Sequence, residues 1–228
     1  MSAALVLHHF AFDPASRLVR LVLGEKRVPF TEAPVRWFDG DSGFERLNPS
    51  GRLPVFVVED EHERLVLCET AAILGFCEEE IPDPPLLPQD QAERAETRRL
   101  TQWFERKFET EVDALLLHEK MEKRLLRLGA PDMAAMRDGR LALRRHLGYA
   151  EQLLREREWL AGRRLTLADF AAAAQLSVLD YFAEVGWGEH PAVKQWYMKL
   201  KSRPCFRPLL ADRLPGVPPA SHYDDLDF

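Results

Sequence analysis

Cysteine is scarce in this sequence, with Cys68, Cys77 and Cys205 as the three examples among 228 residues. The number is odd and no two of them form a CxxC pair, so the chain does not encode a disulfide framework. We expect the three thiols to be small buried side chains in a reducing compartment.

Long hydrophobic runs and an excess of positive charge are also lacking. The longest apolar run without a charge, residues 170–179, is too short to cross a bilayer. Residues 1–9 lack the basic segment and long apolar stretch of a signal peptide. The net charge of −6 argues against a field that attracts DNA or RNA. We therefore expect a cytoplasmic protein with no nucleic acid among its partners and no insertion into a membrane.

Motifs for nucleotide and metal chemistry are missing as well. The chain contains no GxxxxGK[S/T], no GxGxxG and no HExxH sequence. Its seven histidines and three cysteines show no metal-ligand spacing. We expect no metal site and no nucleotide cofactor.

A change of pattern near residue 82 divides the chain. Residues 1–81 alternate between short apolar runs and helical patterns, in the order β-α-β and then β-β-α. Residues 82–88 hold four prolines, which cannot continue a helix and form a stiff linker. Helical patterns fill residues 89–211, and an acidic and aromatic tail, 212–228, follows. We predict two domains, 1–81 and 89–211.

Helices of the second domain are predicted from apolar spacing and from capping residues. Thr166, followed three residues later by Asp169, resembles a capping box with Asp in place of Glu. The run 170–182 is apolar on nearly all sides, which predicts a central buried helix. An earlier apolar stripe repeats about every four residues and consists of Leu100, Phe104, Phe108, Val112 and Leu115.

Several segments, each weak alone, occur in the order and spacing of the cytosolic glutathione S-transferases. The chain resembles that superfamily from residue 5 to about residue 210. The resemblance implies a GST fold, with an α/β thioredoxin-like N-terminal domain and an all-α C-terminal domain. The matching segments are 14–20, 48–55, 69–73, 160–169 and 190–204.

Two of these segments correspond to the glutathione site of the family. Leu53-Pro54 precedes a strand and suits a cis peptide bond, which in the family presents backbone to the cysteinyl part of glutathione. Glu69-Thr70 opens a helix whose N-terminus, in the family, binds the γ-glutamyl end. The same turn and cap are needed for folding whether or not glutathione binds, so both interpretations stay open.

The position that activates glutathione in the family departs from the pattern. Family members place a Tyr, Ser or Cys there, whereas alignment on residues 17–20 places Asp13 at this point. An ionised carboxylate accepts hydrogen bonds, and its negative charge opposes formation of a thiolate. Ser16 is the nearest hydroxyl and the remaining substitute donor. We therefore assign no catalytic residue and expect no cofactor. Glutathione is expected to bind only under the alternative in which the chain is an enzyme.

Two further features make the chain similar to the FzlA type, bacterial GST-like proteins that bind the tubulin-like division protein FtsZ and curve its filaments. One is the aromatic pair before a polar loop, and the other is the acidic, aromatic C-terminus. This narrower resemblance implies a non-enzymatic homodimer located at the division site. The candidate partner-binding residues are Trp37, Phe38, Tyr223, Asp224, Asp225, Asp227 and Phe228.

Alternatives remain for these residues and for the function. Trp37 and Phe38 could instead pack the second strand or the domain interface, and the tail could be disordered or fold back. Our leading hypothesis is a protein that binds FtsZ and organises or curves its filaments during cell division. The alternatives are a glutathione transferase that conjugates glutathione to small electrophiles and a GST-like regulator of another protein. The aromatic surface of the helix with Leu100, Trp103 and Phe104 exceeds what one face can bury, which favours a homodimer.

Overall fold

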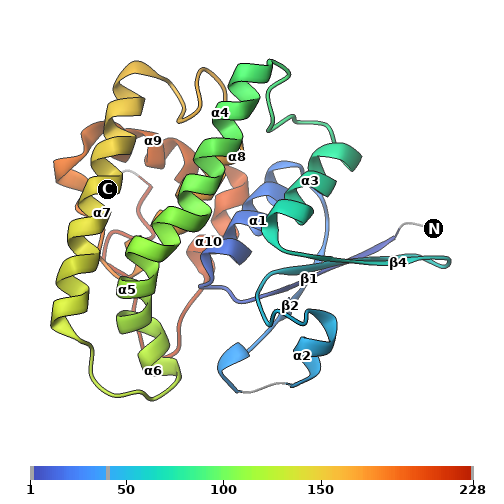
Figure 1. Ribbon diagram of the computed structural model, residues 1–228, viewed down its shortest axis with the longest axis horizontal. Helices are drawn as coiled ribbons and strands as arrows, with labels where there is room; N and C mark the ends of the chain where they lie inside the picture. Colours follow the sequence, from blue (N-terminus) through green and yellow to red (C-terminus); the bar gives the residue numbers. More distant parts are fainter. Residues whose placement is uncertain (1–2, 40–41, 227–228) are drawn as a thin grey trace.

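The computed structural model describes residues 3–39 and 42–226 and places a small mixed sheet with helices beside a larger group of helices (Figure 1). The sheet order is β2-β1-β3-β4, with β1 parallel to β2 and the other neighbours antiparallel. The predicted α/β domain followed by an all-α domain is thereby confirmed. The strands are β1 (Ala4–His9), β2 (Thr31–Pro34), β3 (Val55–Glu59) and β4 (Arg64–Cys68).

Helix α1 (Pro14–Glu25) joins the two parts of the molecule. Asp13 caps it, because the carboxylate accepts a hydrogen bond from the backbone of Ser16, and Pro14 takes the first helical position. Residues 16–23 are all buried, since the helix packs against α8, α3 and the turn that precedes α10. The other helices of this part are α2 (Ser42–Leu47), α3 (Thr70–Glu80) and the short 3₁₀ turn η1 (Trp37–Asp39).

The helical part begins with α4 (Gln91–Gln102) and ends with α10 (Arg207–Ala211). Between them lie α7 (Met133–Glu156), α8 (Leu167–Tyr181) and α9 (Pro191–Lys201). Helix α4 runs on through two π-helical stretches, and the continuation consists of η2 (Trp103–Asp113), α5 (Ala114–Leu117), η3 (His118–Glu122) and α6 (Lys123–Leu125). Two 3₁₀ turns, η4 (Trp187–Glu189) and η5 (Pro204–Phe206), flank α9.

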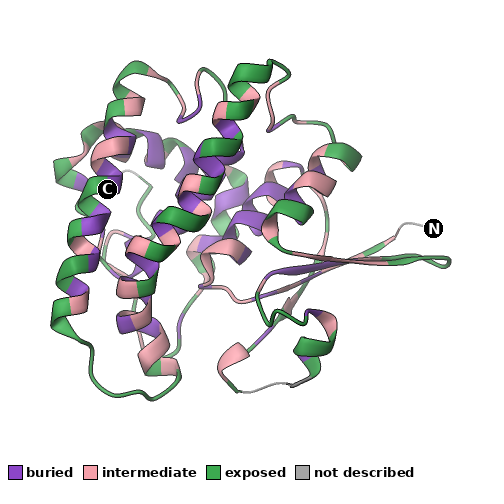
Figure 2. Cartoon of the chain, in the orientation of Figure 1, coloured by how far each residue is buried: buried purple, intermediate pink, exposed green. Residues whose placement is uncertain are grey.

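Helix α8 is the central helix that the sequence predicts. Every residue from Leu167 to Tyr181 is buried, as the purple helix inside the molecule in Figure 2 illustrates. The capping box is also confirmed, because the side chain of Thr166 and that of Asp169 bond reciprocally to the backbone. Asp169 further accepts hydrogen bonds from the Leu160 backbone and the Trp196 indole, both at 2.9 Å. This carboxylate therefore ties the start of α8 to α9 and to the loop before it.

The apolar stripe on α4 and its continuation differs from the prediction at its last member. Leu116 is fully buried, whereas Leu115 is half-buried, so the inward positions advance in steps of four up to residue 116. An α-helix rotates away from such a stripe, because it completes a turn in 3.6 residues; the wider π turns keep these positions facing inward. The fully or nearly fully buried members are Leu100, Phe104, Phe108, Val112 and Leu116.

This burial removes the reason that we gave for a homodimer. Leu100, Phe104 and Phe108 are at most 2% exposed within one chain. Only Trp103 is half-buried, and its ring packs against Tyr149 with centroids 4.7 Å apart. The aromatic side chains of η2 are covered by α7 and α8, so little of their surface remains to contact a second copy of the chain.

Two smaller expectations can be compared with the structure. Cys77 and Cys205 are buried, but Cys68 is half-buried at the end of β4; all three are free thiols. Among the residues that the structure describes, none of the helices combines the length and the hydrophobicity that crossing a bilayer requires.

Candidate functional site

A cleft of about 710 Å³ lies between the sheet part and the helical part. Its first wall comes from the loop before α1, the turn before β3 and the start of α3. Four of the sequence-predicted positions, Asp13, Leu53, Glu69 and Thr70, line this wall together. The second wall comes from α8 and from the π-helical continuation of α4.

Asp13 stands on the cleft wall as the N-cap of α1. Its Oδ2 accepts hydrogen bonds from the Ser16 backbone at 2.7 Å and from the Ser16 hydroxyl at 2.6 Å. Burial raises the pKa of Asp13 to about 6, although both bonds from Ser16 act in the opposite direction. At neutral pH the ionised form prevails, so the cleft presents a negative acceptor where the family places a donor to a thiolate.

Ser16 does not take over the donor role in this geometry. Its side chain is fully buried, it is absent from the cleft lining, and its hydroxyl proton is directed to Asp13. The hydroxyl oxygen also accepts a bond from the Phe10 backbone at 3.3 Å. The alternative in which Ser16 activates a thiol is therefore not supported by the position of its side chain.

The two segments that resemble the glutathione site keep their backbone form. The Leu53-Pro54 bond is cis, as predicted, with Leu53 in the cleft wall and Pro54 buried behind it. Glu69 precedes α3 with a φ of 68°, which is unusual for a residue other than glycine. Its carboxylate accepts a hydrogen bond from the Ser50 hydroxyl at 3.3 Å.

The second wall carries acidic residues that the sequence analysis missed. Glu105, Glu109 and Asp113 recur every four residues, each one position after a member of the buried apolar stripe. This shared period was the available signal, since it places the three carboxylates side by side on one face of the helix. Glu122, farther along the same helix, also lines the cleft, and its carboxylate accepts a hydrogen bond from Nδ1 of His118 at 2.8 Å.

Several polar atoms of this wall have no hydrogen-bond partner among the described residues. They are Oε1 of Glu105, both carboxylate oxygens of Asp113 and Oε1 of Gln175. Burial raises the pKa of Asp113 well above its usual range, and the carboxylates of Glu109, Asp13 and Glu122 raise it further. Burial likewise raises the pKa of Glu105.

The charge of the lining is therefore strongly negative. Only two arginines, Arg52 and Arg106, face the carboxylates among the described lining residues, and Arg52 is already paired with Glu109 at 2.8 Å. A thiolate, or the carboxylate ends of glutathione, would be repelled in such surroundings. The acidic lining residues are Asp13, Glu69, Glu105, Glu109, Asp113 and Glu122.

Trp37 and Phe38 form the 3₁₀ turn η1, and both are half-buried. Their rings pack edge-on against Phe10, with centroids 6.4 and 5.9 Å away, and Trp37 also lines the cleft. The guanidinium of Arg36 lies 5.2 Å from the centre of the Phe38 ring. Both rings therefore pack against Phe10 rather than against β2, Trp37 reaches the cleft between the two parts, and both side chains stay partly exposed.

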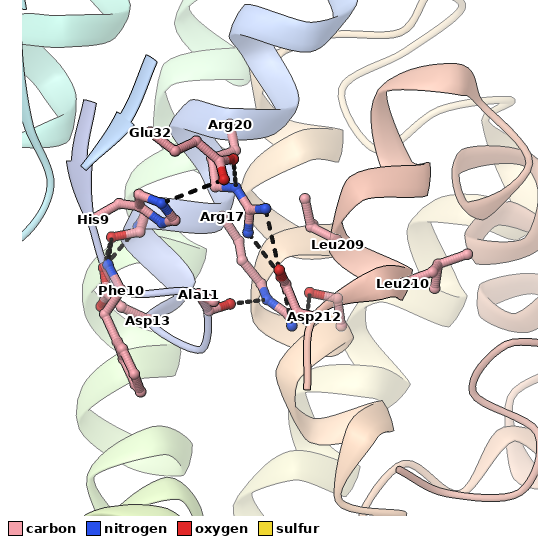
Figure 3. Close-up of polar contacts among 12 residues, drawn as sticks. His9, Phe10, Ala11, Asp13, Arg17, Arg20, Glu32, Leu209, Leu210 and Asp212 are labelled. Carbon is pink, nitrogen blue, oxygen red and sulfur yellow. Dashed lines mark hydrogen bonds and ion pairs between the residues drawn. The ribbon is translucent and has the colours of Figure 1, made fainter. Parts of the chain in front are cut away.

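A buried network of charges fastens the C-terminal segment to α1 (Figure 3). Arg17 and Arg20 are fully or almost fully buried, and both contact Asp212. The Asp212 carboxylate receives two bonds from Arg20, at 2.7 and 3.2 Å, and one from Arg17 at 3.5 Å. Arg20 also pairs with Glu32 at 2.9 Å. Arg17 also donates to the Ala11 carbonyl at 2.7 Å and to the Ser177 hydroxyl of the helical part at 2.9 Å.

The tail beyond Asp212 folds back onto the helical part. Tyr223 is fully buried, donates to the Leu209 carbonyl at 3.0 Å and receives a bond from Arg17 at 3.2 Å. A buried tyrosine cannot contact a partner in this structure. Tyr223 instead anchors the tail, and its prediction as a partner-binding residue is not supported. Asp224 and Asp225 are exposed, and Asp224 pairs with Arg213. Asp227 and Phe228 lie outside the described residues.

The remaining partner-binding candidates form two separate surfaces. The blue turn η1 lies between β2 and α2 on the sheet part (Figure 1), whereas Asp224 pairs with Arg213 and its neighbour Tyr223 is bonded to Leu209, both on the helical part. One chain therefore presents an aromatic surface on its sheet part and an acidic surface on its helical part.

Comparison with known proteins extends over the whole chain. The family of the glutathione S-transferase N-terminal domain matches residues 14–80, and that of the C-terminal domain matches residues 119–204. FtsZ-localized protein A of Caulobacter vibrioides is 66% identical over 229 residues, which cover all of both chains. The solved structure of FzlA from C. crescentus has a TM-score of 0.97 and 65% identity, covering 99% of this chain and 100% of that one. A solved glutathione S-transferase from Rhodospirillum rubrum F11 has a TM-score of 0.94 and 43% identity, covering 98% and 100%.

Proposed function

Because the chain belongs to the glutathione S-transferase family and yet holds Asp13 where that family holds a thiolate donor, we propose that it acts by binding a protein. The partner is FtsZ, whose filaments this protein organises or curves during bacterial cell division, at the division site. The observation that carries the proposal is the 66% identity with FtsZ-localized protein A over the full length of both chains.

The geometry of the cleft supports a role without catalysis. Activation of glutathione requires a donor that stabilises negative charge on sulfur. Asp13 provides an acceptor, and Ser16 directs its proton to Asp13 rather than to the cleft. The acidic second wall adds further repulsion between the protein and an anionic ligand.

Two surfaces are the candidates for the contact with FtsZ. The aromatic surface consists of Trp37 and Phe38, whose partly exposed side chains provide apolar anchors. The acidic surface consists of Asp224 and Asp225, which are exposed and provide charge for association. Because the two surfaces are separated on one chain, they suit an extended partner such as a filament better than a small, compact partner.

A homodimer belongs to the same proposal. Two copies would present each surface twice, so that binding to a repeating filament becomes bivalent and gains avidity. The described surface offers Leu128, Met133 and Leu141, each more than half exposed, as apolar side chains available to a second copy. Light scattering that gives only the 26.2 kDa chain at micromolar concentration would contradict this part.

Sedimentation with FtsZ filaments tests the proposal. The protein should pellet with FtsZ in the presence of GTP and stay in the supernatant with GDP, where filaments are few. Negative-stain electron microscopy of the pellet should show bundled or curved filaments. If the protein remains in the supernatant at every FtsZ concentration tested, the proposal is wrong.

Glutathione transfer is the second candidate, favoured by one observation. Leu53, Glu69 and Thr70, which belong to the segments that resemble the family's glutathione site, line the same cleft. Retention on immobilised glutathione, followed by an assay of chlorodinitrobenzene conjugation, tests it. Retention together with turnover at the family's usual rate would favour the enzyme over the binding protein.

A further inference from the structure

Asp113 is the least compensated charge in the described part of the cleft. Its side chain lies on η2, the residue is 7% exposed, and neither carboxylate oxygen has a hydrogen-bond partner. The charged groups that act on it, Glu109, Asp13 and Glu122, are all carboxylates. A buried carboxylate without a cation or a donor lowers the stability of the fold. Such a residue is expected where a ligand supplies the missing charge.

Gln175 provides an independent sign of a ligand in the same cleft. This residue of α8 is 5% exposed and lines the cleft. Its Nε2 donates to the Phe104 carbonyl at 2.9 Å, which fixes the orientation of the amide and leaves Oε1 without a partner. Together with Oε1 of Glu105 and the Asp113 oxygens, the unsatisfied atoms are all acceptors. They require a ligand that carries several N–H donors.

The cationic side chains of the lining do not meet this requirement. Arg52 is bound to Glu109, and His118 is bound to Glu122. Arg106 is exposed. No salt bridge joins Asp113 or Glu105 to a basic residue within the described ranges 3–39 and 42–226. The missing donors must therefore come from outside the chain.

The shape of the site favours an organic cation over a metal ion. In the part of the chain that the structure describes, no three His, Cys, Asp or Glu side chains converge closely enough to hold a metal. Apolar side chains line the cleft beside the carboxylates, so an aliphatic stem could be buried next to the charges. These side chains include Phe12, Leu18, Leu117, Met121 and Ala171.

We propose that this cleft binds an aliphatic diamine or polyamine. One ammonium group sits at Asp113, and a second sits about two helical turns away, at Glu105 and Gln175. The methylene chain between them lies along the apolar side chains. The proposal does not depend on FtsZ, because every residue that it uses belongs to one chain.

Calorimetric titration of the full-length protein with 1,8-diaminooctane and with spermidine tests the proposal. The matched control ligand is 1,8-octanediol, which has the same stem and no charge. We expect both amines to bind and to raise the melting temperature, while the diol gives no signal at the same concentrations. Asp113→Asn should weaken amine binding at least about tenfold, equivalent to about 1.4 kcal/mol. Glu61→Gln, which removes one charge from an exposed turn, should leave the affinity unchanged.

Three results would overturn the proposal. They are the absence of amine binding to the wild type, equal affinity of the wild type and Asp113→Asn, and equal binding of the diol and the diamine. Circular dichroism establishes that each variant is folded, and Glu105→Gln replaces Asp113→Asn if the latter does not fold. A lysine-rich peptide is the last comparison; its binding in the absence of any free-amine binding would assign the cleft to a protein partner and refute the small-molecule ligand.

Discussion

Replacing Asp212 with asparagine would remove the negative charge shared by two buried arginines. Arg17 is fully buried and Arg20 is 5% exposed, while the side chain of Asp212 is 12% exposed. The amide that replaces the carboxylate keeps one acceptor oxygen and brings a donor group close to the guanidinium of Arg20. The variant therefore has less negative charge and one repulsive contact at the junction of α1 and the C-terminal segment.

The size of the effect follows from what each arginine retains. Removing one partner of a buried ion pair usually costs about 3–5 kcal/mol. Arg20 keeps its ion pair with Glu32, and Arg17 keeps the Ala11 carbonyl and the Ser177 hydroxyl as acceptors. We therefore expect Asp212→Asn to lower the free energy of unfolding by the lower end of this range, about 3 kcal/mol. With a urea m value of about 3 kcal/mol/M for a chain of this size, the midpoint should fall by about 1 M.

Urea denaturation followed by circular dichroism measures this shift. Asp224→Asn is the matched control, because it makes the same chemical change in an exposed pair with Arg213. Exposed pairs contribute about 0–1 kcal/mol, so the control should unfold close to the wild type. Limited proteolysis adds a second readout, since Asp212→Asn should speed cleavage within the tail while the control should not. Equal midpoints for the two variants would refute the argument that the Asp212 charge holds the tail to α1.

Four further predictions concern single side chains. Thr166→Ala should lower the free energy of unfolding by about 1 kcal/mol in urea titrations, because it removes half of the capping box of α8. Burial and neighbouring carboxylates raise the pKa of Asp113, so the folded protein holds this proton more tightly than the unfolded chain and loses stability as pH rises. Asp113→Asn should therefore be more stable than the wild type, by a margin that grows as the pH rises above the usual pKa of an aspartate, about 4; a constant margin would contradict this. Asp13→Ser should conjugate glutathione to chlorodinitrobenzene faster than the wild type, because it replaces an acceptor with a donor. Trp37→Ala should pellet less with FtsZ filaments, provided that its thermal melt shows a folded protein.

Local signals in the sequence predicted much of the fold. Asp13-Pro14 starts α1 and Thr166 with Asp169 starts α8, because capping chemistry depends on residues that are close in sequence. The central position of α8 follows from its composition, since a helix that is apolar on all sides must be buried.

The features that were missed depend on contacts between distant parts of the chain. The position of Tyr223 in the core could not be predicted from an acidic tail, because its partners, Arg17 and Leu209, come from other elements. The burial of Phe104 and Phe108 depends on α7 and α8, which the pattern of this helix alone does not reveal. The carboxylates of the second wall shared the period of the apolar stripe. That these carboxylates line a cleft becomes clear only in the structure, where the first wall lies opposite them.

The contact between Arg17 and Asp212 also has a consequence for the order of events during synthesis. The two residues are 195 positions apart, so the ribosome must add that many residues after Arg17 before this arginine meets its counterion. Until then, Arg20 can pair with Glu32 of the sheet part, but the guanidinium of Arg17 has no carboxylate partner there and cannot be buried without loss. The final docking of α1 must therefore wait for residue 212, although N-terminal segments usually fold first.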